Sequence, residues 1–366
     1  MKKLINSNRK RLNVREKINY NLGQIGIKIL GAVPPEKQVC LPQNYNFDAH
    51  IFSKHFKSTH YGIMVPDLPD PYRYLTCTSI IGDIGVNVTH VPSNQTDLNP
   101  ADTATLIHGT ALTQQKNAYQ ILSIRDQILL KKEPFEVQYG DTTKIYVEDQ
   151  KYYLETNRSD LKVKLEMTPT SALTWFSYNK IYQHFSVLMQ YKGYFIENQK
   201  QVNISGLCTL EHWKCIGFST VLPKKILNDH LLLPLDSFSY QVINIDAEQQ
   251  LVLVYTGFAQ QPAYLTVSYR NINGTSIQYD GEIIFEVEEL LSSALITPDG
   301  YQMDVPKSFK WIAYHQGKKV LDIHAIVDTE YCYGLGAGYV SSYSWNGKFE
   351  GTHLSGKGYL EYIDRR

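Results

Sequence analysis

The sequence lacks several features by which common protein classes are recognised. Its 366 residues carry 36 Lys and Arg against 36 Asp and Glu, so the formal net charge is zero. This balance argues against a generally basic nucleic-acid-binding protein. No apolar run reaches the roughly 18 residues that a transmembrane helix needs. Hydrophobic residues make up 43% of the chain, which is too many for wholesale disorder and enough to bury a sizeable core.

Cysteine is scarce, and its spacing excludes two further classes of protein. The chain has five cysteines, an odd number, and none of them forms a Cys-x-x-Cys pair. We therefore expect neither a disulfide framework nor a thiolate zinc site. Cys208 and Cys215 are close enough in sequence to meet across a turn, but short loops rarely suit disulfide geometry. The Gly-x-Ser-x-Gly motif of α/β-hydrolases is also absent.

Lysines and arginines crowd the first 17 residues, where Glu16 is the only acidic residue. A secretory signal would follow such charge with a continuous apolar stretch. Polar residues interrupt residues 18–35 repeatedly, so we expect a cytoplasmic protein. We interpret residues 1–35 as a basic leader with a helix that packs on the protein. The alternative is a membrane-surface anchor formed by residues 1–31.

The rest of the chain is rich in residues that favour β-strands. Tyrosine outnumbers phenylalanine by 27 to 13, and tyrosine suits half-buried pleated surfaces. Residues 251–255, 263–270 and 277–287 are predicted strands, because they are rich in Val, Ile, Tyr and Thr. Asn273-Gly274 between two of these segments is a hairpin turn signal. Short strands joined by turns indicate barrels or sandwiches rather than βαβ units.

The length of the chain favours two domains or one large β domain. Prolines at residues 66–71 and a polar stretch at 93–104 predict long loops. Residues 217–236 interrupt the β pattern with a proline, lysines and a polar cluster. We therefore predict a first β domain at 36–217 and a second at 218–366.

An internal repeat supports this division. Residues 204–213 read ISGLCTLEHW, and residues 354–363 read LSGKGYLEYI. Ser-Gly and Leu-Glu recur at the same relative positions, an aromatic pair or near-pair follows, and each segment closes its predicted domain. Two related β domains in tandem are the interpretation that this pattern favours.

The segment Gly356-Lys-Gly-Tyr-Leu-Glu361 resembles the closing strand of the AttH-like proteins. These group with carotenoid 1,2-hydratase and tocopherol cyclase in a superfamily of double lipocalin-like barrels. The resemblance implies an all-β fold of two lipocalin-like antiparallel barrels in tandem. The family's first barrel ends in a similar strand, here closing on Glu211-His212-Trp213, although Lys214 stands where a glycine often follows. Residues 60–72 are similar to an uncharacterised bacterial branch, so the resemblance implies the fold more firmly than an activity.

Glu211, His212 and Trp213 form the leading candidate site. Strand alternation predicts Glu211 and Trp213 on one face and His212 on the other. A carboxyl group inside a hydrophobic barrel would have a raised pKa and could protonate a carbon–carbon double bond, with the ring of Trp213 stabilising the carbocation. His212 is the second catalytic candidate. The alternative is that Glu211 pairs with a basic residue and Trp213 belongs to the core.

Tyr359 and Glu361 occupy the repeat-equivalent positions in the second predicted domain. With Trp213, they are the candidate ligand-binding residues. Because Leu-Glu occurs in both copies of the repeat, a structural role common to both barrels is the competing interpretation.

Other histidines and glycines give weaker signals. His50, His55 and His60 recur every five residues, a spacing that fits neither one helix face nor one strand face, so no metal site is predicted. Asp322 and His324 share one face of a predicted strand, which we interpret as a solvated outer face. The run at 334–338, Gly-x-Gly-x-Gly, lacks the context of a phosphate-binding loop and predicts a β turn or bulge.

The combined prediction is a protein that binds a hydrophobic small molecule, such as an isoprenoid or fatty-acyl lipid, in a barrel cavity. One alternative is a hydratase- or cyclase-type enzyme with a buried carboxyl group as general acid. Another is a scaffold whose barrels are filled by side chains. No cofactor and no nucleic-acid partner are expected.

Overall fold

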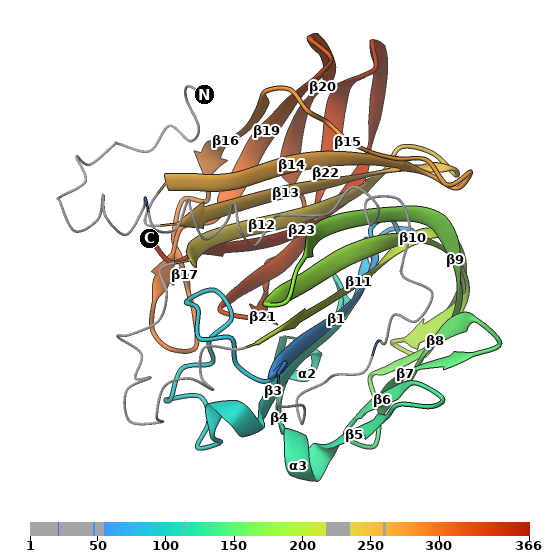
Figure 1. Ribbon diagram of the computed structural model, residues 1–366, viewed down its shortest axis with the longest axis vertical. Coiled ribbons are helices and arrows are strands. Elements are labelled where there is room, and N and C mark those ends of the chain that lie inside the picture. Colours follow the sequence, from blue (N-terminus) through green and yellow to red (C-terminus); the bar gives the residue numbers. More distant parts are fainter. Residues whose placement is uncertain (1–20, 22–46, 48–54, 114, 217–234, 259–260) are drawn as a thin grey trace.

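The computed structural model describes residues 21, 47, 55–113, 115–216, 235–258 and 261–366. Two large antiparallel sheets dominate it (Figure 1). The first sheet contains β1 (Ser58–Val65), β2 (Leu75–Ile81), β3 (Thr103–Thr110), β4 (Tyr119–Ser123), β5 (Ile128–Lys131), β6 (Glu136–Tyr139), β7 (Thr143–Glu148), β8 (Lys151–Asn157), β9 (Leu161–Tyr178), β10 (Tyr182–Glu197) and β11 (Lys200–Cys215). These eleven strands form an almost closed barrel.

The second sheet curves into a half-barrel. It contains β12 (Leu235–Asn244), β13 (Gln249–Phe258), β14 (Gln261–Asn271), β15 (Ser276–Gln278), β16 (Ile283–Leu290), β19 (Pro306–His315), β20 (Lys318–Val327), β21 (Cys332–Leu335), β22 (Gly338–Phe349) and β23 (Thr352–Asp364). A small separate hairpin joins β17 (Leu295–Ile296) to β18 (Gln302–Met303).

Helices are short in the part of the chain that the structure describes. They are η2 (Pro100–Asp102), α2 (Gln115–Ala118) and α3 (Ile124–Gln127). None of the described helices is long and apolar enough to cross a membrane. The predicted all-β class with two barrel-like sheets is therefore confirmed.

The repeated sequence segment has an equivalent place in both sheets. β11 pairs with β10, the strand before it, and with β1, the first strand of its sheet. β23 likewise pairs with β22 and with β12, the first strand of the second sheet. Each copy of the Leu-Glu motif therefore lies on a central strand, flanked on both sides by hydrogen-bonded neighbours.

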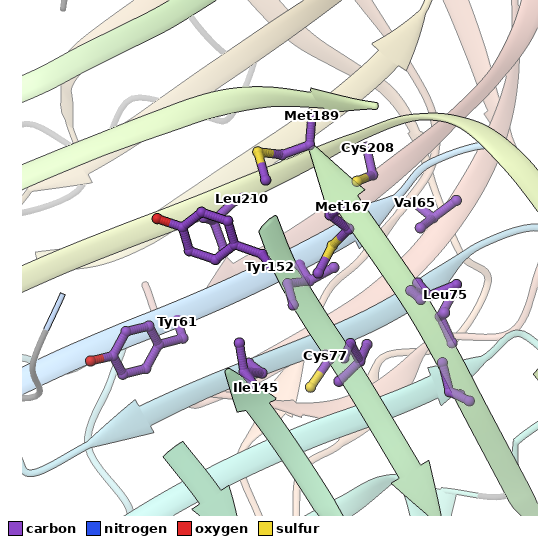
Figure 2. Close-up of a cluster of buried hydrophobic side chains, with 14 of the residues drawn as sticks. Tyr61, Val65, Leu75, Cys77, Ile145, Tyr152, Met167, Met189, Cys208 and Leu210 are labelled. Atoms are coloured by element: carbon purple, nitrogen blue, oxygen red, sulfur yellow. The ribbon is translucent and has the colours of Figure 1, made fainter. Parts of the chain in front are cut away.

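The barrel centre of the first sheet is a packed hydrophobic cluster. Because side chains alternate along a strand, Tyr61 and Val65 of β1 point inward together. They belong to the same cluster as Tyr152 of β8 and Met167 of β9, which come from the opposite wall (Figure 2). A second core, which includes the fully buried Trp311, fills the concave side of the second sheet.

Most of the local predictions match the structure. Strands β13 and β14 cover the segments predicted at 251–255 and 263–270, and the turn at Asn273-Gly274 joins β14 to β15. The segment predicted at 277–287 is divided between β15 and β16, because residues 279–282 leave the ladder at Asp280-Gly281. The leader at 1–35 and most of the predicted boundary at 217–236 lie outside the described residues.

The predicted loop at 93–104 belongs to a longer connection between β2 and β3 that packs against the other sheet. Val86 and Val88 are buried in the core of the second sheet. The backbone N–H of Ala337 donates to the carbonyl of Val88 at 3.0 Å. Residues from the first half of the chain therefore complete part of the hydrophobic core of the second sheet.

The outer faces of the two sheets meet in a layer that we call the seam. Its apolar part is one cluster of buried side chains from both sheets, namely Met64, Tyr74, Ile107, Ala118, Phe176, Tyr240, Val242, Val252, Val254, Leu335, Val340 and Tyr359. In Figure 1, β12 and β23 lie along β10 and β11 at this layer. The central strands consequently have no solvent-facing side.

A buried arginine also connects the two sheets. Arg73, 7% exposed, precedes β2 and forms an ion pair with Asp328, which follows β20. The same guanidinium donates to Ser342 of β22 at 3.2 Å and to Asp70 at 3.3 Å. Because burial strengthens such contacts and makes an unpaired charge costly, this arginine helps to hold the seam closed.

We expect leucine in place of Arg73 to lower the free energy of unfolding by about 2 kcal/mol, because Asp328 loses its cation. Glutamine in place of Lys307 is the control, because Lys307 and Glu289 are 51% and 58% exposed and such pairs contribute about 0.5 kcal/mol or less. Urea unfolding of the two variants measures both effects. Equal effects would show that Arg73 does not connect the sheets energetically.

Candidate functional site

Glu211 lies at the centre of the seam, not inside the first barrel. Its neighbours in the strand ladders are Gly62 of β1 and Ser186 of β10. The inward positions of β11 are Cys208 and Leu210, which belong to the barrel core, so the side chain of Glu211 points to the opposite face. There it meets the second sheet.

The predicted alternation along β11 is present. Trp213 shares the outer face with Glu211, and its ring stacks on His60 with centroids 5.5 Å apart. His212 points into the barrel, where its ring packs against Tyr61 at 4.9 Å and Phe185 at 5.7 Å. The two catalytic candidates, Glu211 and His212, are therefore separated by the sheet itself.

The carboxylate of Glu211 is paired with a histidine. Nε2 of His184, on β10, is hydrogen-bonded to Oε1 of Glu211. On the other side of the imidazole, the Tyr182 hydroxyl lies 2.8 Å from Nδ1. The side chains of His184 and Glu211 are 11% and 5% exposed, so the pair is almost fully buried.

The pKa of Glu211 differs from the sequence-based expectation. Burial acts to raise this pKa, but the attraction and hydrogen bond of His184, aided by His60 and a hydrogen bond from Tyr240, lower it below its ordinary value. Glu211 is therefore a carboxylate at neutral pH. The expected raised pKa required an apolar barrel interior, whereas the seam offers this carboxyl group polar partners.

Glu361 carries the raised pKa instead. It is 4% exposed, and burial, together with repulsion from Glu211, raises its pKa well above the ordinary value. The hydroxyl of Tyr359 donates to Oε1 of Glu361 at 3.1 Å and lies 3.0 Å from Oγ1 of Thr76 on β2. Glu361 therefore stays protonated under conditions in which Glu211 is ionised.

The two glutamates of the sequence repeat thus face one another across the seam. Tyr240 is adjacent to both, since it is the register partner of Glu361 and helps to lower the pKa of Glu211. His60 completes the group, with burial lowering its pKa to about 4. We call these residues the acid–base cluster; its members are His60, His184, Glu211, Tyr240, Tyr359 and Glu361.

The acid–base cluster has the properties needed for proton transfer. One carboxyl group holds a proton, another accepts one, and the two affect each other electrostatically. Two titratable groups whose surroundings push their pKa values apart are the usual basis for dividing acid and base roles at one site. Glu211 and Glu361 are both buried. A glutamate that only capped a strand end or formed a surface ion pair would not need to be buried.

The remaining sequence candidates lie elsewhere. Asp322 and His324 are on the outer face of β20, where they contact Lys319 and Glu288, as the predicted solvated face requires. Gly334 to Gly338 form the end of β21 and its turn into β22. His50 lies outside the described residues, and within them no group of three His, Cys, Asp or Glu side chains could hold a metal ion.

Comparison with known proteins identifies the family of the chain. A family model described as a family of unknown function (DUF6670) matches residues 78–366. The chain belongs to this family. The matched part of this DUF6670 protein contains both glutamates of the acid–base cluster and all of the second sheet. No curated protein shows a significant sequence match to the chain.

Two solved structures resemble this DUF6670 protein along most of its length. A protein from Nitrosomonas europaea, provisionally assigned as an AttH, has a TM-score of 0.57 at 12% identity and covers 92% of this chain and 100% of its own. CghA has a TM-score of 0.52 at 7% identity, with 92% and 96% covered. At these identities the likeness shows the fold alone. The AttH-like, lipocalin-like barrel fold implied by the sequence is confirmed.

Proposed function

We propose that the protein is an enzyme that binds a hydrophobic small molecule and transfers a proton to it in the seam. The proposal rests on two pKa values that are shifted in opposite directions, that of Glu361 upwards and that of Glu211 downwards. Glu361 is held protonated and Glu211 ionised although both are buried. The protonated carboxyl group is the one that can act as general acid.

The reaction that suits this pair is addition across a carbon–carbon double bond, as in a hydratase or cyclase. The O–H bond of Glu361 breaks and its proton forms a C–H bond with one alkene carbon, which leaves a carbocation on the other. Water or an internal nucleophile of the substrate captures the cation. The proton released in that step passes to the Glu211–His184 pair, which returns it to solvent, while solvent reprotonates Glu361 for the next turnover.

The surroundings of the cluster favour a hydrophobic substrate. Trp213 and Tyr182 provide aromatic faces beside His60 and His184, and such faces stabilise a passing positive charge. The apolar side chains of the seam lower the local dielectric, which strengthens the electrostatic effect of Glu211 on a developing cation. An isoprenoid or unsaturated acyl chain has the required double bond and little charge.

The seam is a better candidate for the binding site than the centre of the first barrel. That centre contains the hydrophobic cluster, part of which is drawn in Figure 2. His212, a candidate from the sequence analysis, points into this barrel. Its ring is packed among aromatic rings. In the seam, polar and apolar groups converge from both sheets, as they do in ligand sites.

The decisive experiment combines ligand identification with isotope transfer. Native mass spectrometry of the purified full chain, followed by organic extraction, identifies any hydrophobic molecule that it carries. The extracted molecule is then incubated with the protein in D2O. We expect one deuterium on carbon in the product, since the acid proton exchanges with solvent before it is transferred.

The other outcomes decide between the alternatives. A bound molecule that acquires no deuterium would indicate a carrier. No bound molecule, and no deuterium transfer to an isoprenoid panel led by geranylgeraniol, would favour a scaffold.

A further inference from the structure

A second buried charge lies in the seam next to the acid–base cluster. Arg270 is on β14 of the second sheet and has 0% exposure. Its side chain reaches the first sheet, where Nη1 donates to Oγ of Ser186 at 2.8 Å and Nη2 to Oγ1 of Thr209 at 3.0 Å. Ser186 is the register partner of Glu211 on β10. The guanidinium is therefore hydrogen-bonded to the residue that lies directly beside Glu211 in the sheet.

The partners of Arg270 are all neutral. Besides Ser186 and Thr209, the guanidinium donates to the amide oxygen of Gln250. Among the described residues, no carboxylate forms an ion pair with Arg270, and its Nε–H has no hydrogen-bond acceptor. Glu211 attracts the guanidinium through space, but it is bonded to His184.

A fully buried arginine without an anion is an unusual arrangement. Buried charges in proteins are normally paired, because removing an ion from water costs several kcal/mol. Burial lowers the pKa of Arg270 only to about 10, so the group remains a cation at neutral pH. The site therefore has a positive charge and an unused donor in an environment where an anion would be strongly attracted.

Hydrogen bonds connect Arg270 to the acid–base cluster. The hydroxyl of Ser186, which accepts from Arg270, also lies 3.0 Å from the hydroxyl of Tyr240. Tyr240 in turn helps to lower the pKa of Glu211. An anion at Arg270 would thus be bound beside the cluster, while the apolar side chains of the seam, such as Val242 and Val252, would contact the hydrocarbon part of the same molecule.

We propose that the substrate is a hydrophobic acid whose carboxylate, or comparable single anion, binds to Arg270. This inference rests on the proposed function and adds the chemical class of its substrate. A guanidinium is suited to the task because its donors match the geometry of a carboxylate. The anion fixes one end of the molecule, and the hydrocarbon chain extends towards Glu361.

The test compares probes that differ only in their head group. Tetradecanoate, methyl tetradecanoate and 1-tetradecanol are titrated into the full-length protein by calorimetry at pH 8, where the acid is ionised. We expect tetradecanoate to bind about thirty-fold more tightly than the ester or the alcohol, or better, since a buried charge pair loses at least this much when one partner is removed.

Substitutions test whether Arg270 causes the preference for the acid over the ester and the alcohol. Arg270→Gln should abolish the preference for the acid, and Arg270→Lys should keep part of it. Arg125→Gln, at a side chain that is 80% exposed, is the control and should leave the preference unchanged.

The wild-type comparison alone can overturn the inference, even if Arg270→Gln fails to fold. Equal affinity for the three probes, no binding of any of them, or an undiminished acid preference in a folded Arg270→Gln would each refute it. The proposed function fails differently, because its readout is deuterium transfer to carbon. Acid preference without deuterium transfer would support the role of Arg270 and reject the enzymatic reaction.

Discussion

Glutamine in place of Glu361 is expected to reduce the rate of proton transfer to substrate by about 100- to 10,000-fold, the usual contribution of a general acid. Glutamine has nearly the same shape and can still accept the hydrogen bond of Tyr359, but it has no carboxyl proton to give. Affinity for the substrate should remain close to that of the wild type. Single-turnover deuterium transfer in D2O measures the rate, and calorimetry measures the affinity.

The same substitution should make the protein more stable at high pH. The pKa of Glu361 is raised in the folded protein from about 4.5, so its contribution to stability is fully present below pH 4.5 and is lost as the pH rises towards the folded-state pKa. Each pH unit in that window costs the wild type about 1.4 kcal/mol. Glu361→Gln has no carboxyl group to ionise and avoids this loss. Its free energy of unfolding should therefore equal that of the wild type near pH 4 and clearly exceed it at pH 8.

A loss of activity joined to a gain in stability distinguishes an acid from a structural residue. Glu289→Gln is the control, because that side chain is 58% exposed, and neither quantity should change measurably. Urea unfolding at pH 4 and pH 8 gives the stability difference. If Glu361→Gln were less stable at pH 8 and transferred deuterium at the normal rate, its assignment as the acid would be rejected.

The fold was predictable because local signals and the global arrangement agree. In β14, Leu265 and Val267 alternate with Thr266 and Ser268, and the strand has two different faces. Asn273-Gly274 forms a tight turn because glycine adopts the positive φ of 96° at Gly274 without strain. The repeated Leu-Glu segments were equally informative, since both occur on the closing strand of a sheet.

The orientation of Glu211 could not be predicted for a physical reason. Alternation along β11 separates Glu211 and Trp213 from His212, but it does not say which of the two faces is the inside of the barrel. The last nine residues of β11 are all buried, because one face packs on the barrel core and the other on the second sheet. When both faces are buried, hydrophobicity no longer distinguishes them.

His184, Tyr240 and Arg270 were missed for a different reason. They lie on β10, β12 and β14 and belong to no short motif. Their contacts, such as those joining Ser186 to Tyr240 and to Arg270, span the two sheets and depend on how the sheets pack. A single sequence contains no local signal for such an arrangement; the only available hint was that Glu211 needed a basic partner.

Glutamine in place of Glu211 should act in the opposite direction on stability. The pKa of Glu211 is lowered in the folded protein, so the carboxylate contributes stability above its unfolded pKa of about 4.5, and this contribution is lost as the pH falls through the folded-state value. Removing the charge leaves His184 without its buried carboxylate partner. We expect a loss of about 2–4 kcal/mol at pH 7, measured by urea unfolding, and this loss should become smaller as the pH falls below about 4.5.

Activity should fall together with stability in this variant. Without the Glu211 carboxylate, the developing carbocation loses one stabilising negative charge and the released proton loses its assigned acceptor, so deuterium transfer should decrease by about 100-fold or more. Glu155→Gln is a suitable control, because Glu155 likewise has basic partners, here two lysines, but is 27% exposed at the barrel surface. An unchanged rate in a folded Glu211→Gln would remove this residue from the mechanism.

The double variant tests whether the two glutamates act as one unit. Repulsion by Glu211 helps to raise the pKa of Glu361, so removing the charge of Glu211 should lower that pKa. The stability gained through Glu361→Gln at pH 8 should therefore be smaller in the Glu211→Gln background than in the wild type. Groups in contact commonly show coupling free energies of about 0.5–3 kcal/mol. Strict additivity would mean that the two carboxyl groups titrate independently, and a shared acid–base role would then have no electrostatic basis.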